Sequence, residues 1–372
     1  MLRVLHVIND TNIGGAGRYL LTFLEHYDRE RLRVQVLCPA GSLLADRCRE
    51  LGVQVFPSAS LAGDRSFAWS GLVSTIGEIS DLIKREKIQV VHTHASFIAR
   101  LAARRAGVDV VYTRHRLDWG GGKRGIKGWA REMLNRATSR RVIAISQAVR
   151  EALLAEGTPA DRIELIYNGI DVEKLRKEAS RWEGREGLGL VGSPVVGMVG
   201  RLEPEKGHRC FLEAAARVSK DFPGAVFLVV GDGSLGHKLR EQAHDLGISD
   251  SVVFTGFRDD VPGLISAMDV LVMPSLTEAF GFSLVEGMAL GRPCVASAVG
   301  GILEIAEDGR TALLVPPGDA EAVAEKVESL LRDKDAASEM GKRAAEEVER
   351  RFSARVMAEK ITALYESVNG AG

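Results

Sequence analysis

The sequence predicts an α/β protein built from two doubly wound domains, each a parallel sheet with helices on both faces. Short apolar runs alternate with amphipathic helical segments along the whole chain, which is typical of parallel sheets. A Gly-rich, charged stretch interrupts this alternation, which then begins again. The 372 residues suffice for two domains of ordinary size. We expect an N-terminal domain at 1–178, a linker at 179–194, a C-terminal domain at 195–352, and a last helix at 353–372 that packs back toward the N-terminal domain.

The first half begins with a strand and a Gly-rich turn at 9–17. Its helical segments place apolar residues three or four apart, whereas its strand segments are short and rich in Val, Ile and Leu. Strands are expected at 1–8, 34–38, 53–56, 88–94, 108–113, 141–145 and 163–166, and helices at 18–27, 42–51, 72–86, 99–106, 123–138 and 146–156.

The second half repeats the pattern and ends in three consecutive helices. Strands are expected at 195–199, 225–230, 252–255, 269–273, 294–296 and 312–315, and helices at 207–220, 236–246, 261–268, 281–290, 319–332, 335–352 and 354–368.

Composition is typical of a globular protein, and the opening residues form a short apolar strand rather than an export signal. No apolar run approaches the length needed to cross a bilayer. The four Cys residues form no CxxC pair or metal spacing, which favours reduced thiols in a cytoplasmic protein. Residues 1–180 hold 28 Lys or Arg against 20 Asp or Glu, although the whole chain carries a net charge of −1. A basic half favours an anionic surface or substrate.

Two carboxylates lie in one strand–loop–helix unit of the second half. Glu278 follows the apolar strand at 269–273, and Glu286 lies within the helix that follows. Eight helical steps rotate by roughly 80° and rise about 12 Å, so the two carboxylates suit opposite ends of one elongated ligand better than a tight pair. The N–H groups near Gly281, Phe282 and Ser283 begin the helix and can receive an anion. A nucleotide sugar has hydroxyls at both ends and phosphate between them. The alternative is that Glu278 caps the helix and Glu286 is solvated.

Arg201 and Lys206 follow another strand end and lie five residues apart in a loop. Two cations there can hold a diphosphate and neutralise its charge as it leaves. A solvated loop is the alternative interpretation.

Polar and small residues also follow the strands of the first half. Gly14, Gly15 and Gly17 come after the first strand, where the absence of a Cβ lets the backbone approach a phosphate or sugar. Their spacing is not GxGxxG. His92 and His94 lie at a strand end without an accompanying Cys or carboxylate, so contact with an acceptor or sugar is favoured over a metal site. A hydrogen-bonded loop histidine remains the alternative.

These motifs together resemble glycosyltransferase family 4, whose members are retaining enzymes of the two-domain GT-B fold, with Rossmann-like domains facing across a cleft. The resemblance runs through nearly the whole chain and is most specific in the second half. It rests on the segments 200–207 (GRLEPEKG), 230–233 (VGDG), the Glu278–Glu286 unit and Gly300-Gly301, with 14–18 (GGAGR) and 167–171 (YNGID) in the first half. Tyr167 stands where many members have Pro.

The resemblance implies a site for each part of the reaction, with no metal and no cofactor beyond a UDP- or GDP-sugar as co-substrate. Catalysis is assigned to Glu278, His115, Arg201 and Lys206. Donor binding is assigned to Gly14, Gly15, Arg201, Lys206, Gly231, Phe257, Arg258, Glu278, Phe280, Gly281, Phe282, Ser283 and Glu286. Acceptor binding is assigned to Gly17, Arg18, His92, His94, His115 and Arg116, and Arg116 stands where the family usually has Gly, which favours an anionic acceptor.

The acceptor is expected to be a cell-envelope glycan, such as lipopolysaccharide or capsule, or its lipid-linked precursor. Residues 114–141 hold nine Lys or Arg and two Asp or Glu, and the helix at 123–138 is amphipathic with a Trp on its apolar face. Such a helix suits an anionic membrane surface, which would place a cytoplasmic enzyme on the inner face of the membrane. A core-facing stripe with a solvated basic side is the alternative.

Three other functions remain open from the sequence. They are a soluble transferase acting on a small metabolite, a sugar-nucleotide epimerase of the same fold, and a non-catalytic nucleotide-sugar sensor. Nucleic acid is not an expected partner, because the basic region matches no recognisable reader fold.

Overall fold

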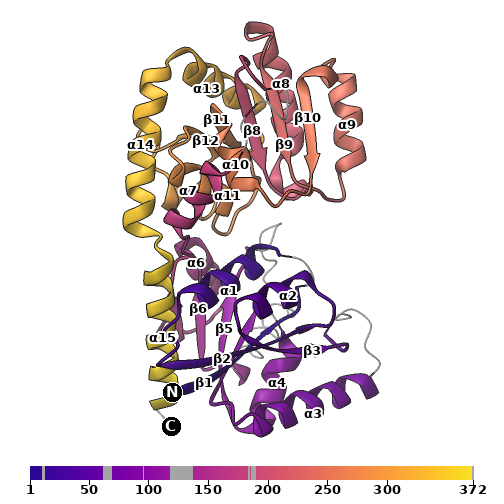
Figure 1. The fold of residues 1–372 in the computed structure, drawn as a ribbon, viewed down its shortest axis with the longest axis vertical. Coiled ribbons are helices and arrows are strands. Elements are labelled where there is room, and N and C mark those ends of the chain that lie inside the picture. Colours follow the sequence, from indigo (N-terminus) through magenta and orange to yellow (C-terminus); the bar gives the residue numbers. More distant parts are fainter. Residues whose placement is uncertain are drawn as a thin grey trace. The chain divides into compact units, whose positions relative to one another are not determined.

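The computed structural model describes residues 1–10, 13–61, 69–94, 96–117, 137–182, 185 and 190–370. The chain divides into two compact units, one formed by Met1–Gly169 with Ala354–Gly372 and the other by Ile170–Ser353. Each unit contains one parallel sheet flanked by helices (Figure 1). The predicted α/β fold with two doubly wound domains is therefore confirmed, and the cleft stays a prediction.

The sheet of the first unit has the strand order β3-β2-β1-β4-β5-β6-β7. Every neighbouring pair is parallel. The order reverses between β1 and β4, and ligands of doubly wound sheets bind beyond the carboxyl ends of the strands at such a point. The strands are β1 (Leu2–Ile8), β2 (Leu32–Pro39), β3 (Gln54–Ser58), β4 (Val90–His94), β5 (Asp109–Arg114), β6 (Arg141–Ala144) and β7 (Ile163–Leu165).

The helices of the first unit bury apolar faces against this sheet and against each other. Leu5, Val91 and Ala99 belong to one fully buried cluster shared by β1, β4 and α4. The described helices are α1 (Gly15–His26), α2 (Leu43–Glu50), α3 (Trp69–Arg85), α4 (Phe97–Ala106), α6 (Gln147–Ala155) and α15 (Ala354–Gly370).

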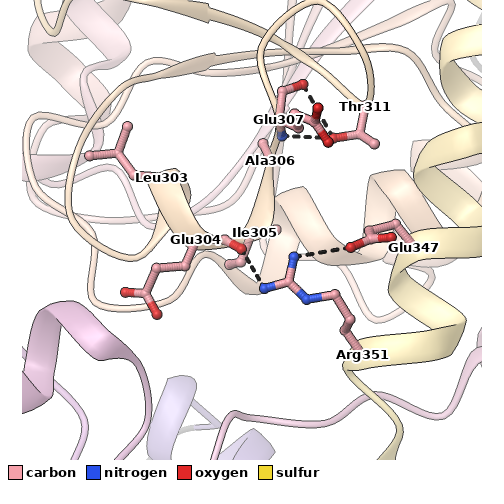
Figure 2. A pocket seen from close by; sticks show the side chains of 8 residues that line it. All are labelled: Leu303, Glu304, Ile305, Ala306, Glu307, Thr311, Glu347 and Arg351. Atoms are coloured by element: carbon pink, nitrogen blue, oxygen red, sulfur yellow. Dashed lines mark hydrogen bonds and ion pairs between the residues drawn. The ribbon is translucent and has the colours of Figure 1, made fainter.

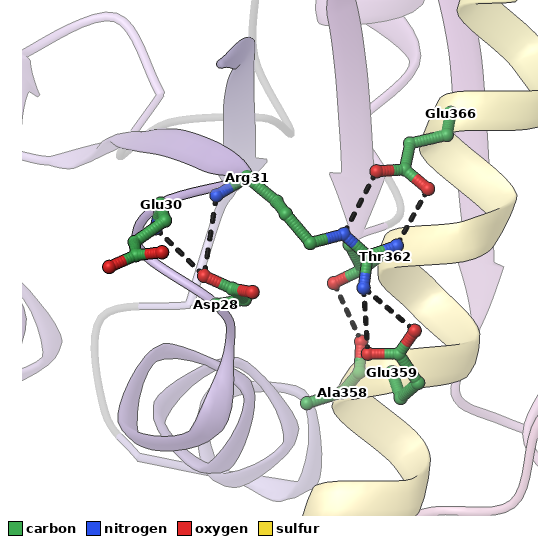
Figure 3. Close-up of polar contacts among 7 residues, drawn as sticks. All are labelled: Asp28, Glu30, Arg31, Ala358, Glu359, Thr362 and Glu366. Atoms are coloured by element: carbon green, nitrogen blue, oxygen red, sulfur yellow. Dashed lines mark hydrogen bonds and ion pairs between the residues drawn. The ribbon is translucent and has the colours of Figure 1, made fainter.

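The last helix, α15, belongs to the first unit although the second unit precedes it in the chain. Its buried face includes Ile361 and Tyr365, both with no exposed surface. At its edge, Arg31 donates to Glu366 at 2.7 Å and to Glu359 at 2.8 Å, two acceptors on one side of the helix (Figure 3). The apolar face thus fixes α15 on the unit, and Arg31 connects two of its turns to the start of β2.

The second sheet has the strand order β10-β9-β8-β11-β12-β13, again all parallel. Its reversal lies between β8 and β11. The strands are β8 (Val195–Val199), β9 (Val226–Val230), β10 (Val252–Gly256), β11 (Val270–Met273), β12 (Cys294–Ser297) and β13 (Leu313–Val315). The helices are α7 (Val172–Ser180), α8 (His208–Asp221), α9 (Gly236–Asp245), α10 (Val261–Ser266), α11 (Phe282–Ala289), α12 (Ile302–Ile305), α13 (Ala320–Arg332) and α14 (Lys334–Arg351).

The division between the units falls at Gly169, before the expected boundary at 178. The reason is that α7 packs against α10 and α11 of the second unit. Trp182, just after α7, also donates from Nε1 to Oδ2 of Asp260 at 3.0 Å. Much of the expected linker, at 183–184 and 186–189, lies outside the described residues.

The basic helix expected at 123–138 also lies outside the described residues, except for its last two positions. Within the part of the chain that the structure describes, no helix is both long enough and apolar enough to cross a bilayer.

Candidate functional site

Two loops meet at the switch point of the second sheet. The loop after β8 carries Arg201 and Lys206, and the loop after β11 carries Glu278. β8 and β11 pair directly, with Val270 opposite Val196. Arg201, Lys206 and Glu278, which the sequence predicts to bind a nucleotide sugar, therefore lie where a doubly wound sheet binds ligands.

Lys206 and Glu278 form an ion pair between these loops. Nζ of Lys206 lies 2.5 Å from Oε2 of Glu278, and the two side chains are 22% and 12% exposed. Gly207 allows the close approach, because its φ is 76° and a Cβ there would lie 1.9 Å from the carbonyl oxygen of Pro274. Partial burial lowers the effective dielectric, so this pair is held more firmly than a surface pair. A cation and a carboxylate thus stand side by side at the switch point.

Arg201 is more exposed than Lys206. Its side chain is 60% exposed, and Nη2 lies 3.1 Å from Oε1 of Glu205. An ion pair this exposed contributes roughly 0–1 kcal/mol, so the guanidinium can exchange it for an anionic ligand. The structure brings Lys206 and Glu278 together, whereas the binding of one diphosphate by both Arg201 and Lys206 stays a prediction.

Helix α11 begins with Gly281 at its N-cap, in the left-handed region at φ 102°, and none of the described side chains caps it. The first N–H groups of any helix lack intrahelical partners, so those at Phe282 and Ser283 are suited to receive an anion. Glu286 lies in the second turn of α11 and is half-buried.

Gly301 supports the Glu278 loop, a role that the sequence did not reveal. Its N–H donates to the carbonyl oxygen of Glu278 at 3.0 Å. A Cβ at Gly301 would lie 2.4 Å from the carbonyl oxygen of Ala279, which is backbone and cannot move aside cheaply. The Gly300-Gly301 pair was the sequence feature from which this support of the Glu278 loop could have been predicted.

The residues expected around the nucleobase and diphosphate differ in their environments. Gly231 has φ 136°, and a Cβ there would meet the carbonyl oxygen of Gly200 at 2.0 Å, so glycine is required for the turn itself. Phe257 is 62% exposed. Arg258 donates from Nε and Nη2 to Asp260 at 2.7 and 2.6 Å and lowers the pKa of that carboxyl.

Phe280 is buried, and its assignment to donor binding stays a prediction. Its ring is only 2% exposed and packs edge-on against Phe282 and Phe352, with centroids 5.3 and 5.6 Å away. The ring therefore belongs to the core of the unit, and only the backbone of Phe280 remains to contact a donor.

In the first unit, the glycines follow β1 and lead into α1, at the switch point of that sheet. Gly14 is the N-cap at φ −84°, and a Cβ there would lie 3.6 Å from Oδ2 of Asp10, an ordinary contact. Gly15 is exposed, Gly17 is buried, and Arg18 is half-buried. Gly14 is therefore not required by its own conformation, which leaves ligand approach as its candidate role.

His92 and His94 are buried, with 0% and 3% exposure, and both nitrogens of each ring have protein partners. Their expected contact with an acceptor is therefore corrected, because neither ring has a nitrogen left for a ligand. His115 is half-buried, and its Nδ1 has no hydrogen-bond partner among the described residues. Burial lowers the pKa of His115 to about 3, so the ring is neutral near pH 7. Arg116, the next residue, is exposed.

A separate cavity of about 320 Å³ lies in the second unit between α12 and α14. Arg351 extends into it, donating to the carbonyl oxygen of Glu304 at 2.8 Å and to Glu347 at 3.1 Å (Figure 2). None of the expected site residues lines this cavity.

His6 and Tyr365 lie among the histidines but were missed by the sequence reasoning. His6 sits within an apolar strand, and Tyr365 lies in the last helix, more than 200 residues from His115. The sequence feature that could have indicated this cluster was the presence of histidines on two of the expected strands. In the structure these strands pair, and His6 lies directly opposite His92.

Comparison with known families matches both halves of the chain. The model described as "Glycosyl transferases group 1" matches residues 180–347, and "Glycosyltransferase Family 4" matches residues 13–174. A UDP-Gal:alpha-D-GlcNAc-diphosphoundecaprenol alpha-1,3-galactosyltransferase of Escherichia coli is 30% identical over 81% of this chain and 80% of its own length.

Two other comparisons agree. A GDP-mannose-dependent alpha-(1-6)-phosphatidylinositol monomannoside mannosyltransferase of Mycobacterium tuberculosis is 32% identical over 58% of this chain and 60% of its own length. Among solved structures, HepE from Anabaena, crystallised with UDP and glucose, superposes with a TM-score of 0.86 at 24% identity, covering 99% of this chain and 100% of the other. This likeness establishes the same fold.

Proposed function

We propose a lipid-linked glycan of the cell envelope as the acceptor of this chain, which belongs to glycosyltransferase family 4 and is a nucleotide-sugar-dependent glycosyltransferase. The observation that carries the proposal is the relative from E. coli, whose name gives GlcNAc-diphosphoundecaprenol as its acceptor and which matches four-fifths of this chain. The mycobacterial relative is named for a phosphatidylinositol mannoside. Both names describe a sugar carried on a lipid.

The donor diphosphate is proposed to bind at the switch point of the second unit. Support comes from the start of α11, which no described side chain caps and which offers N–H groups to an anion, and from the ammonium of Lys206, which is paired with Glu278 in the loop that leads into α11. Glu278 then accepts hydrogen bonds from hydroxyls of the transferred sugar, and Glu286 from those of the ribose. Arg201 exchanges its exposed contact with Glu205 for the diphosphate.

The proposed reaction proceeds with retention at the anomeric carbon. The bond from that carbon to the diphosphate oxygen breaks, and a bond to the acceptor hydroxyl oxygen forms on the same face of the sugar. The acceptor proton passes to an oxygen of the departing diphosphate. Lys206, Arg201 and the N–H groups of α11 stabilise the charge that develops on the leaving group, a contribution that is commonly the largest in such reactions.

Membrane association completes the proposal. Residues 114–141 carry a strong excess of Lys and Arg, which suits the anionic headgroups surrounding a lipid-linked acceptor. We expect binding to vesicles that contain anionic lipid at low salt, and loss of binding as salt rises. Absence of binding at low salt would contradict this part of the proposal.

A second candidate is transfer to a small metabolite. Two relatives from Streptomyces, named for glucosyl and N-acetylglucosaminyl transfer to 2-deoxystreptamine, are 34% and 39% identical but match only 56% and 50% of this chain. Their shorter matches make this the weaker candidate.

The test offers UDP- and GDP-sugars to the full chain, first in a thermal-shift panel and then in transfer assays. A bound donor raises the apparent stability by mass action. We expect transfer to a diphosphoundecaprenol-linked sugar and none to 2-deoxystreptamine. Transfer to 2-deoxystreptamine alone would replace the proposed acceptor. Isomerisation of the donor without acceptor would indicate an epimerase, and binding without turnover a sensor.

A further inference from the structure

A continuous set of hydrogen bonds joins the last helix to His115 through the first sheet. Nε2 of His6 lies 3.0 Å from the hydroxyl of Tyr365, Nδ1 of His6 lies 3.1 Å from Nε2 of His94, and Nδ1 of His94 lies 2.9 Å from Nε2 of His115. The same tyrosine hydroxyl lies 2.5 Å from Nδ1 of His92. The five side chains come from β1, β4, the end of β5 and α15.

All four rings are neutral near pH 7. Burial lowers the pKa of His6 and His115 to about 3, and burial with the neighbouring rings lowers the pKa of His92 and His94 well below its usual range. A neutral imidazole carries one N–H donor and one acceptor nitrogen. Each contact between two such rings therefore needs a proton on one side and a lone pair on the other.

This requirement couples the rings. If Nδ1 of His6 carries the proton, Nε2 of His94 must accept the hydrogen bond from it, so the proton of His94 is on Nδ1. For the same reason Nε2 of His115 accepts from Nδ1 of His94, and the proton of His115 is on Nδ1. The opposite choice at His6 reverses every contact. The hydroxyl of Tyr365 has a single proton, so donating to His6 obliges it to accept from Nδ1 of His92, and accepting from His6 lets it donate to His92.

We propose that Tyr365 and the four histidines form one hydrogen-bonded chain in which all four rings adopt the same tautomer. Tyr365, His6 and His94 are then positioning residues for His115. Its Nδ1, which is buried and has no hydrogen-bond partner among the described residues, ends the chain. A group that reaches this nitrogen either accepts from it or donates to it, and that choice extends through the sheet to the hydroxyl of Tyr365.

The other end of the chain permits both states. Nε2 of His92 lies 2.6 Å from Oγ1 of Thr113, and a hydroxyl can donate or accept. Because Thr113 accommodates either tautomer, the group bound at His115 can select the state of the whole chain. The two states contain the same number of protons and therefore carry the same net charge.

A buried metal ion is the competing explanation for this cluster. Ring nitrogens of His6, His92 and His94 lie within 4.8 Å of one another. We favour the hydrogen-bonded chain because every nitrogen of these three rings already has a neighbour at 2.5–3.1 Å.

The test is nitrogen NMR of the ¹⁵N-labelled full chain, which reports the nitrogen that carries the proton in each ring. We expect the four histidines to show the same tautomer, whichever it is. One ring in the opposite tautomer, an imidazolium among them at neutral pH, or a stoichiometric divalent metal in elemental analysis of the purified protein would overturn the proposal. This NMR measurement requires neither a variant nor an active enzyme.

Tyr365→Phe tests the positioning role, with the half-buried Tyr27→Phe as the matched control. Loss of the hydroxyl should shift the ring nitrogen signals of both His6 and His92, and unchanged signals would overturn the role of Tyr365. The transfer assay rests on the proposed function. There, kcat/KM should fall about fivefold in Tyr365→Phe, equivalent to ~1 kcal/mol for one hydrogen bond, and stay unchanged in the control. Unchanged kcat/KM in Tyr365→Phe would remove the effect on catalysis but leave the NMR result standing.

Discussion

Replacing Lys206 with Met should reduce turnover strongly while the protein stays folded. The substitution keeps the length of the side chain and removes its charge, which lies 2.5 Å from Glu278 at 22% exposure. At an effective dielectric near 20, a unit charge about 4 Å from a phosphate contributes ~4 kcal/mol. Loss of one such contact to developing charge lowers kcat by roughly 10²–10³ in comparable sites.

The same substitution leaves Glu278, at 12% exposure, without its cation. We expect a stability loss of about 1–3 kcal/mol in urea unfolding, because a sheltered charge loses its partner. The double variant Lys206→Met with Glu278→Gln should recover part of that stability and none of the activity. Lys220→Met, at an exposed position of α8 in the same unit, is the control. Wild-type turnover in Lys206→Met, measured with saturating donor, would refute the assignment.

Three further predictions concern the supports of the site. Gly301→Ala should destabilise the second unit by about 1–3 kcal/mol through its clash with backbone, whereas Gly224→Ala, with open space around it, should be near neutral in urea unfolding; equal effects would contradict the packing argument. Arg31→Gln should increase hydrogen exchange in α15, since two acceptors lose their donor, and unchanged exchange would show that the contact is dispensable. The burial that lowers the pKa of His6 and His115 to about 3 should make the protein acid-sensitive, because the unfolded chain, with a histidine pKa of about 6.5, binds protons first as pH falls. The urea concentration at the unfolding midpoint should therefore be highest above pH ~6.5 and fall steadily below it. A midpoint that rises on acidification would contradict the inference that these rings are neutral in the folded protein.

The sequence could predict the elements of the site but not how they pair. Lys206 and Glu278 were identified separately from their places after apolar strands, because strand ends and glycine turns leave a local signal. Their contact joins loops 72 residues apart, and only the strand order brings β8 beside β11. Strand order is a property of the whole fold, which no local pattern carries.

The histidines show the same limit. Local reasoning placed His92 and His94 at a strand end and inferred contact with an acceptor. In the structure the strand register sets His6 opposite His92, and both rings are buried. Helix α15, which is distant in the sequence, places the hydroxyl of Tyr365 within hydrogen-bonding distance of His92. The boundary error at 170–178 has a similar cause, because α7 carries no compositional sign of the unit it packs against.

A crystal structure of the full chain with a bound nucleotide sugar tests the proposed diphosphate site most directly. We expect diphosphate oxygens within hydrogen-bonding distance of Nζ of Lys206 and of the N–H groups of Phe282 and Ser283 at the start of α11. A diphosphate bound elsewhere in the second unit, such as the cavity around Arg351, with Lys206 still paired to Glu278 alone, would contradict it.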